Sequence, residues 1–106
     1  MRKGDIILLP FPFTDLSGSK VRPALILYNA KHDVTVAFIS SINQVVDSTD
    51  ISLTPDQSNG LKRDSVLKLH KIATLDKDIV LGKLGELTNK QLEDVDKGLK
   101  KIFNLK

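Results

Sequence analysis

The sequence predicts a small, mainly β protein, a barrel-like sheet closed by one C-terminal helix. Three observations support this fold class. Several short apolar or alternating segments are separated by turn residues, the last segment has helical periodicity, and 106 residues leave room for one core. An open sheet of this size would expose its edges, which favours closure into a barrel. We therefore expect a single domain over residues 1–106.

The first half of the chain contains three expected strands. Residues 4–10 and 21–28 are short apolar runs rich in branched residues, and residues 34–40 alternate between apolar and polar positions. That alternation places Val34, Val36, Phe38 and Ser40 on one face. Between the first two runs, residues 14–20 are polar and contain Ser17-Gly18-Ser19, which predicts an exposed loop and a candidate binding surface.

Further strands are expected at residues 51–53, 65–72 and 82–87, with a single helical turn at 74–78. Within 65–72, Leu67 and Leu69 alternate with Lys68 and His70. Lys68 and His70 should therefore share one face of the sheet.

The end of the chain predicts an amphipathic helix. Thr88 and Gln91 stand at the spacing of a capping box, and Leu87 and Leu92 at that of a hydrophobic staple. Gly98 lowers helix propensity, so it indicates either a close packing contact or a bend. We expect one apolar stripe to pack on the barrel, with part of it available to a dimer interface: Leu92, Val95, Leu99, Ile102 and Phe103.

Composition excludes several classes of protein. The chain has no cysteine and two histidines, which argues against disulfides, thiol nucleophiles and His/Cys zinc sites. No apolar run approaches the roughly 20 residues of a membrane helix, so we expect a soluble, cytoplasmic protein. The net charge of +3 arises from intermixed lysines and acids and permits an anionic partner without requiring one. Glycine-rich phosphate loops, paired-histidine metal motifs and nucleophile elbows are absent from the sequence.

A group of basic and hydroxyl residues remains as the candidate site, and it suits a phosphate ligand. The group comprises Ser17, Ser19, Lys20, Arg22, Ser40, Ser41, Lys68, His70 and Lys71. The aromatic residues Phe11, Phe13 and Phe38 have two interpretations, stacking on unpaired bases or packing in the core. Their low abundance favours the core.

Residues 4–27, which include Pro10-Phe11-Pro12-Phe13 and Arg22-Pro23, resemble the N-terminal signature of the PemK/MazF family of toxins from toxin–antitoxin pairs. The resemblance continues through residues 36–41, 60–66, 74–77 and 85–88, and thus covers nearly the whole chain. It implies an SH3-like barrel of the PemK/MazF/CcdB type that forms a homodimer. It further implies cleavage of single-stranded RNA without a metal or other cofactor, and inhibition by the flexible tail of a cognate antitoxin.

The resemblance also implies roles for individual residues. The family's arginine falls on Arg22, and its hydroxyl residue after the third strand falls on Ser40, where threonine is more familiar. The chain departs from the family at His70 and Lys71, where some members have an acidic residue followed by glutamine. Lys68 stands where at least one branch has arginine. The departure leaves open which group takes the proton.

The chemistry of RNA fits such a site. The 2′-hydroxyl lies next to the phosphate, and intramolecular placement of this kind supplies an effective molarity of about 10⁵ M or more. We expect Arg22 to clamp the phosphate, Ser40 to donate a hydrogen bond and His70 to carry the proton, because imidazole changes charge near neutral pH. His32, in a predicted turn, is a weaker candidate. The products would be a 2′,3′-cyclic phosphate and a free 5′-hydroxyl. Ser17, Ser19, Lys20, Ser41, Lys68 and Lys71 are expected to bind RNA.

Other interpretations remain open. A toxin of the same fold could inhibit a protein target such as DNA gyrase, because a fold does not fix function. The chain could also be a non-catalytic RNA-binding or peptide-binding module. At the level of single residues, Arg22 could be a solvated strand-end residue, and Ser40 could simply bond a nearby backbone group.

Overall fold

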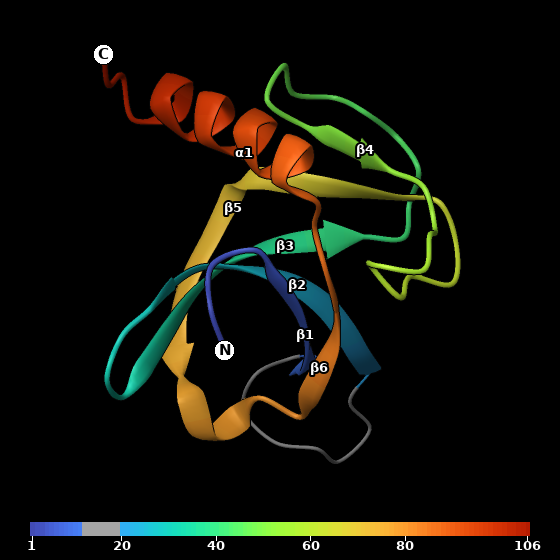
Figure 1. Ribbon diagram of the computed structural model, residues 1–106, viewed down its shortest axis with the longest axis vertical. Coiled ribbons are helices and arrows are strands. Elements are labelled where there is room, and N and C mark those ends of the chain that lie inside the picture. Colours follow the sequence, from blue (N-terminus) through green and yellow to red (C-terminus); the bar gives the residue numbers. More distant parts are fainter. Residues whose placement is uncertain (12–19) are drawn as a thin grey trace.

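The structure is a computed structural model that describes residues 1–11 and 20–106, and Figure 1 shows it as a curled sheet with one helix packed across it. Its elements follow the order expected from the sequence. They are β1 (Asp5–Phe11), β2 (Lys20–Asn29), β3 (Asp33–Ser40), β4 (Ile51–Leu53), β5 (Ser65–Asp76), a 3₁₀ helix (Lys77–Ile79), β6 (Gly82–Glu86) and α1 (Asn89–Ile102).

The six strands form one antiparallel sheet in the order β4-β5-β3-β2-β1-β6. Its pairing is interrupted by register shifts between β1 and β6, β2 and β3, and β3 and β5. Such shifts increase twist and curl a sheet toward closure. The expected mainly β, barrel-like fold with a C-terminal helix is confirmed.

Both faces of the central strands are buried, because the curled sheet has an interior and the helix covers part of its other face. Alternation along β1, β2 and β3 therefore sends apolar side chains both ways. The cluster on the helix side contains Ile6, Leu25, Ala37, Ile39, Leu67, Leu69 and Val95. The other cluster contains Ile7, Leu9, Ala24, Ile26, Val34 and Val36, with Phe38 packed against it.

A sharp bend divides β5 (Figure 1). Ala37 of β3 pairs with Ile72, whereas the next residue, Phe38, pairs with Lys68, so residues 69–71 have no partner on β3. The half before the bend pairs with β4 and the end of β3, and the half after it pairs with the start of β3. His70 and Lys71 lie at this bend and are exposed.

The expected helical turn at 74–78 is placed too early. Residues 74–76 still belong to β5, where Thr74 pairs with Thr35 and Asp76 pairs with Asp33. The helical turn begins only at Lys77, and the Asp76 carboxylate caps it by accepting from the backbone N–H of Asp78 at 2.8 Å. Cross-strand pairing with β3 thus prevails over the local turn signal.

The helix matches its capping prediction. Thr88 and Gln91 form the reciprocal capping box, and Val95 is fully buried. Gly98 is a close packing contact, because a Cβ there would collide with the Leu69 side chain. Phe103, expected in the packed stripe, instead follows the last helical residue and is 57% exposed. None of the helices in residues 1–11 and 20–106 is long and apolar enough to cross a membrane.

Candidate functional site

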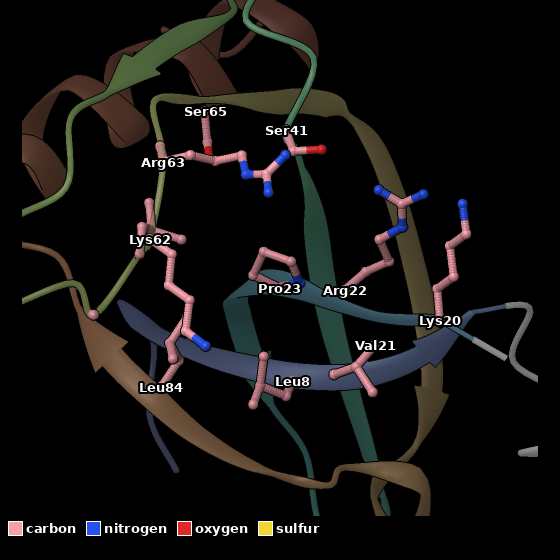
Figure 2. A pocket seen from close by; sticks show the side chains of 12 residues that line it. Leu8, Lys20, Val21, Arg22, Pro23, Ser41, Lys62, Arg63, Ser65 and Leu84 are labelled. Atoms are coloured by element: carbon pink, nitrogen blue, oxygen red, sulfur yellow. The ribbon is translucent and has the colours of Figure 1, made fainter.

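A basic pocket of about 610 Å³ opens at the start of β2 (Figure 2). Lys20 and Arg22 extend into its mouth from β2, and Lys62 and Arg63 come from the loop that precedes β5. Ser41 and Ser65 add hydroxyl groups. The apolar lining consists of Leu8, Val21, Pro23, Leu61 and Leu84. Cations and hydroxyls around an apolar floor are suited to a nucleotide, whose phosphate is anionic and whose base is flat and apolar.

The four cations of this basic pocket are not neutralised within the described part of the chain. The ion pairs there involve other lysines and arginines, namely Arg2, Lys3, Lys68 and Lys83. The guanidinium carbon of Arg22 lies 5.9 Å from the centre of the Phe11 ring, within cation–π range. Phe11 is 47% exposed, so its expected place in the core is wrong. It lies beside Arg22 of the pocket instead.

The register of the sheet positions Arg22 relative to Ser40. Leu9 pairs with Arg22 on one side of β2, and Ala24 pairs with Phe38 on the other. Arg22 and Ser40 each lie two residues beyond that last pair, on the neighbouring strands β2 and β3. The Ser40 Oγ accepts a hydrogen bond from the backbone N–H of Ile42 at 3.1 Å. No described group accepts the Ser40 hydroxyl hydrogen, so the hydroxyl can still donate to a ligand.

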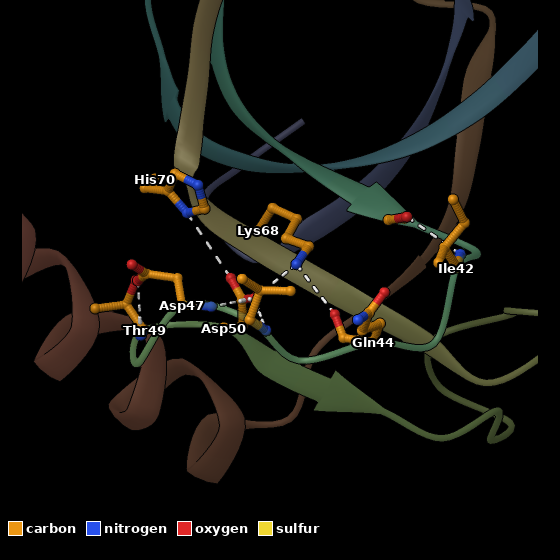
Figure 3. A network of polar contacts seen from close by, with 9 residues as sticks. Ile42, Gln44, Asp47, Thr49, Asp50, Lys68 and His70 are labelled. Atoms are coloured by element: carbon orange, nitrogen blue, oxygen red, sulfur yellow. Dashed lines mark hydrogen bonds and ion pairs between the residues drawn. The ribbon is translucent and has the colours of Figure 1, made fainter.

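A second polar cluster, the Asp50 network, lies between β5 and the loop of residues 41–50 (Figure 3). The Asp50 side chain is 0% exposed, and its Oδ2 accepts from Lys68 Nζ at 2.6 Å and from the backbone N–H groups of Val46 and Asp47, each at 3.0 Å. Lys68 Nζ also donates to the Gln44 carbonyl at 3.1 Å. Lys68 therefore holds the loop of residues 41–50 against β5 through these two contacts.

Both carboxylates of the network have lowered pKa values. Burial by itself would raise the pKa of Asp50, but the hydrogen bonds from Lys68, Val46 and Asp47 outweigh it and lower the pKa to about 2. Hydrogen bonds from the side chain and backbone of Thr49 lower the pKa of Asp47. Both groups are consequently anionic near neutral pH.

The Asp50 network contains three side chains of types that bind metal ions. Ligand atoms of Asp47, Asp50 and His70 lie within 4.8 Å of one another. However, Lys68 already places an ammonium on Asp50, and Asp47 Oδ2 accepts both the N–H and the hydroxyl of Thr49. These contacts supply positive charge and donors where a cation would have to bind, so we assign no metal to the cluster.

The predicted site residues divide between the two regions. Lys20, Arg22 and Ser41 line the basic pocket. Ser40 does not line it but directly precedes Ser41 in the sequence. Lys68 belongs to the Asp50 network, as does His70, whose side chain is 40% exposed. His70 and Lys71 do not line the basic pocket. Ser17, Ser19 and Phe13 lie outside the described residues, and His32 is exposed in the turn after β2.

Sequence reasoning missed Lys62, Arg63 and Asp50 as functional candidates. The first two stand in the 60–66 segment, which carries part of the family resemblance, so that segment was the available signal. Asp50 had no comparable signal. Its partners Lys68 and His70 are 18 and 20 residues away along the chain, and only folding brings them together.

Comparison with known proteins identifies the family. A model of the PemK-like, MazF-like toxins of type II toxin–antitoxin systems matches residues 2–103. The chain belongs to this family. It is 31% identical over 93 residues to Endoribonuclease MazF6 of Mycobacterium tuberculosis, covering 82% of each chain. It is 30% identical over 106 residues to Endoribonuclease MazF of Staphylococcus saprophyticus, covering 93% of this chain and 88% of that protein.

The fold agrees with solved structures as well. A mycobacterial endoribonuclease, solved in complex with its cognate antitoxin, superposes with a TM-score of 0.78 at 19% sequence identity. The superposition covers 100% of this chain and 97% of the other. The chain therefore has the fold expected for this toxin family, an SH3-like barrel.

Proposed function

We propose that this MazF-family toxin is an endoribonuclease that cleaves single-stranded RNA through attack by the RNA's own 2′-hydroxyl. The observation that carries the proposal is the basic pocket, where four cations that have no acidic partner within residues 1–11 and 20–106 surround an apolar floor. Membership of the family and the two endoribonuclease relatives support the same activity. The backbone phosphates would supply negative charge to these four cations.

In the proposed reaction the 2′-oxygen forms a bond to phosphorus, and the bond from phosphorus to the 5′-oxygen breaks. The products are a 2′,3′-cyclic phosphate and a 5′-hydroxyl. Arg22 holds the phosphoryl oxygens with its planar guanidinium, which suits bidentate contact and stays charged. Ser40 donates its hydroxyl hydrogen to the same phosphate. These contacts stabilise charge that builds up in the transition state.

His70 takes the proton of the 2′-hydroxyl and later returns it to solvent, and the leaving 5′-oxygen takes its proton from solvent. A single imidazole does not serve both oxygens at once, because they lie on opposite sides of the phosphorus during in-line displacement. His70 and Arg22 stand on strands separated by β3. Two strand spacings amount to about 10 Å across the sheet, and His70 is also offset from Arg22 along the strand direction, so the bound RNA strand would have to span the distance between the two side chains.

The remaining basic and hydroxyl residues would position the RNA strand. Lys20, Ser41, Lys62 and Arg63 line the pocket and would contact neighbouring phosphates and sugars. Lys71, exposed at the bend of β5, would extend this track, together with Ser17 and Ser19. Lys68 contributes indirectly in this proposal, because its ammonium is held by Asp50.

The proposed partners are a cognate antitoxin and a second copy of the chain. A mycobacterial structure of the same fold is a complex with its cognate antitoxin, which supports the first. Exposed apolar residues on the 41–50 loop, Ile42, Val45 and Val46, are available for a homodimer interface. Light scattering of the purified protein tests the dimer directly.

The deciding experiment incubates the purified protein, with EDTA present, with a mixed-sequence RNA and with the same sequence as DNA. We expect cuts in RNA only, with cyclic phosphate and 5′-hydroxyl ends identified by end-group analysis. The Arg22→Ala variant should cut about 10²- to 10³-fold more slowly, whereas Arg2→Ala, which alters an exposed arginine paired with Glu86 outside the pocket, should cut normally. Equal cleavage of DNA would refute 2′-hydroxyl attack. Growth inhibition without RNA cleavage would favour a protein target.

A further inference from the structure

The Asp50 network contains one buried polar atom whose need for a partner is unmet. Oδ2 of Asp50 has three hydrogen-bond donors, but Oδ1 is buried and makes no hydrogen bond within residues 1–11 and 20–106. A buried carboxylate oxygen without a hydrogen-bond donor destabilises the folded state, so a donor at this point would stabilise it. The nearest ring nitrogen is Nδ1 of His70, 3.8 Å from Oδ1 (Figure 3).

The network fixes the Asp50 carboxylate before any ligand binds. Lys68 on β5 and the N–H groups of Val46 and Asp47 hold Oδ2, which determines the direction of Oδ1. On the other side, the bend of β5 presents His70 as an exposed residue. The carboxylate is therefore rigid and buried, and the imidazole reaches from it toward solvent.

We propose that Asp50 is a positioning residue for His70: its Oδ1 accepts the Nδ1–H of the imidazole, which leaves Nε2 as the atom that exchanges a proton with RNA. This inference rests on the proposed function, because it assigns a task to the His70 of that reaction. A neutral imidazole carries its proton on one nitrogen only, and an acceptor at Nδ1 selects the form whose Nε2 is a base. The same carboxylate stabilises the imidazolium that forms after proton transfer.

The other charges around His70 allow the inference to be separated from a general electrostatic effect. The loop contributes Asp47 and Asp50, and β5 contributes Lys68 and the adjacent Lys71. From α1, Lys101 donates to Ser48 of the same loop at 2.8 Å. Asp47 carries the same charge as Asp50, but its Oδ2 is occupied by Thr49, so it serves as the matched control.

The first test is independent of RNA cleavage. Nitrogen-15 NMR of the imidazole, with EDTA present, distinguishes a proton on Nδ1 from one on Nε2. We expect the wild type to carry it mainly on Nδ1, Asp50→Asn to lose that preference and Asp47→Asn to keep it. A wild-type proton mainly on Nε2, or equal shifts in the two variants, overturns the inference. This readout stands even if the protein cuts no RNA, which would refute the proposed function alone.

The second test is a double-mutant cycle on cleavage rates. Asp50→Asn should lower kcat at least 10-fold with little change in KM, and should move the acid limb of the rate–pH profile to lower pH. In a His70→Ala background the same change should cost almost nothing, because there is no imidazole left to position. An equal loss in both backgrounds means that Asp50 is only structural. Should Asp50→Asn fail to fold, the Asp50→Asn/Lys68→Met double variant neutralises both members of the buried pair and replaces it throughout.

Discussion

The basic pocket and the Asp50 network use the same type of charge in opposite ways. In the pocket, Arg22 and Arg63 have no acidic partner among the described residues, so their charge is available to a ligand. In the network, Lys68 is 13% exposed, and its Nζ lies 2.6 Å from Oδ2 of the fully buried Asp50 side chain. Its charge is therefore paired within the protein and is not available to a ligand. The comparison shows that a cation near a site is a candidate ligand contact only when the fold leaves it unpaired.

The largest effect expected from this difference is on catalysis by the pocket. Replacing Arg22 with alanine should lower kcat/KM for RNA about 10²- to 10³-fold, the usual cost of removing one donor that stabilises transition-state charge. The rate of cleavage of a short fluorogenic RNA measures it. Thermal unfolding should be nearly unchanged, since Arg22 has no ion-pair partner in the described part of the chain. A variant that unfolds early yet cuts RNA at the wild-type rate would reverse the assignment.

The next effect is on stability and belongs to the network. Lys68→Met should destabilise the protein by about 3 kcal/mol, because it leaves the buried Asp50 without a counter-charge. The matched change in the pocket, Arg63→Met, should alter the free energy of unfolding by no more than about 0.5 kcal/mol and should weaken RNA binding instead. Urea unfolding and a binding titration measure the two quantities. The comparison fails if the two variants exchange these effects.

A smaller effect is expected from pH. Asp50 has a pKa of about 2 in the folded protein and an ordinary value of 3.8 when exposed. The ionised carboxylate therefore contributes stability that is fully present above about pH 4 and is lost as the pH falls toward 2. Urea unfolding between pH 5 and pH 2 should show a steeper decline for the wild type than for Asp50→Asn. Parallel curves would mean that the network does not hold this charge.

The smallest effect concerns the aromatic border of the pocket. Phe11→Leu removes the ring beside the Arg22 guanidinium, a contact of about 0.5–1 kcal/mol, and should lower kcat/KM two- to five-fold. Phe103→Leu, at an exposed position after α1, should have no effect on cleavage. If both variants behave alike, the ring does not assist the arginine.

Most of the fold could be predicted because local patterns determine it. Short apolar runs and alternation located the strands, and Thr88 and Gln91 marked the start of the helix, since caps and periodicity depend on neighbours in the sequence. The bend of β5 could not be predicted. Residues 67–70 alternate, and the consecutive polar residues His70 and Lys71 that follow do not by themselves distinguish a bend from the end of a strand. The three unpaired residues become apparent only when β5 is aligned against β3.

The candidate site, too, could be predicted only where a local sequence pattern marks its residues. Arg22 and Ser40 were found through a sequence signature, and the shared face of Lys68 and His70 through alternation, which their contacts with Asp50 confirm. Which of these cations is free for a ligand depends on Asp50, and no local pattern identifies a partner 18 residues away. Burial and pairing of charges are properties of the folded chain, so this part required the structure.

Gly98 places the helix in direct contact with the strand that carries His70. Its missing side chain lets α1 rest directly on Leu69, the residue beside His70, and a Cβ there would also approach Thr49 of the 41–50 loop. The helix thus packs against the bend of β5 at Leu69. A methyl group at this position would have to displace the Leu69 side chain, and the displacement would occur at the residue next to His70.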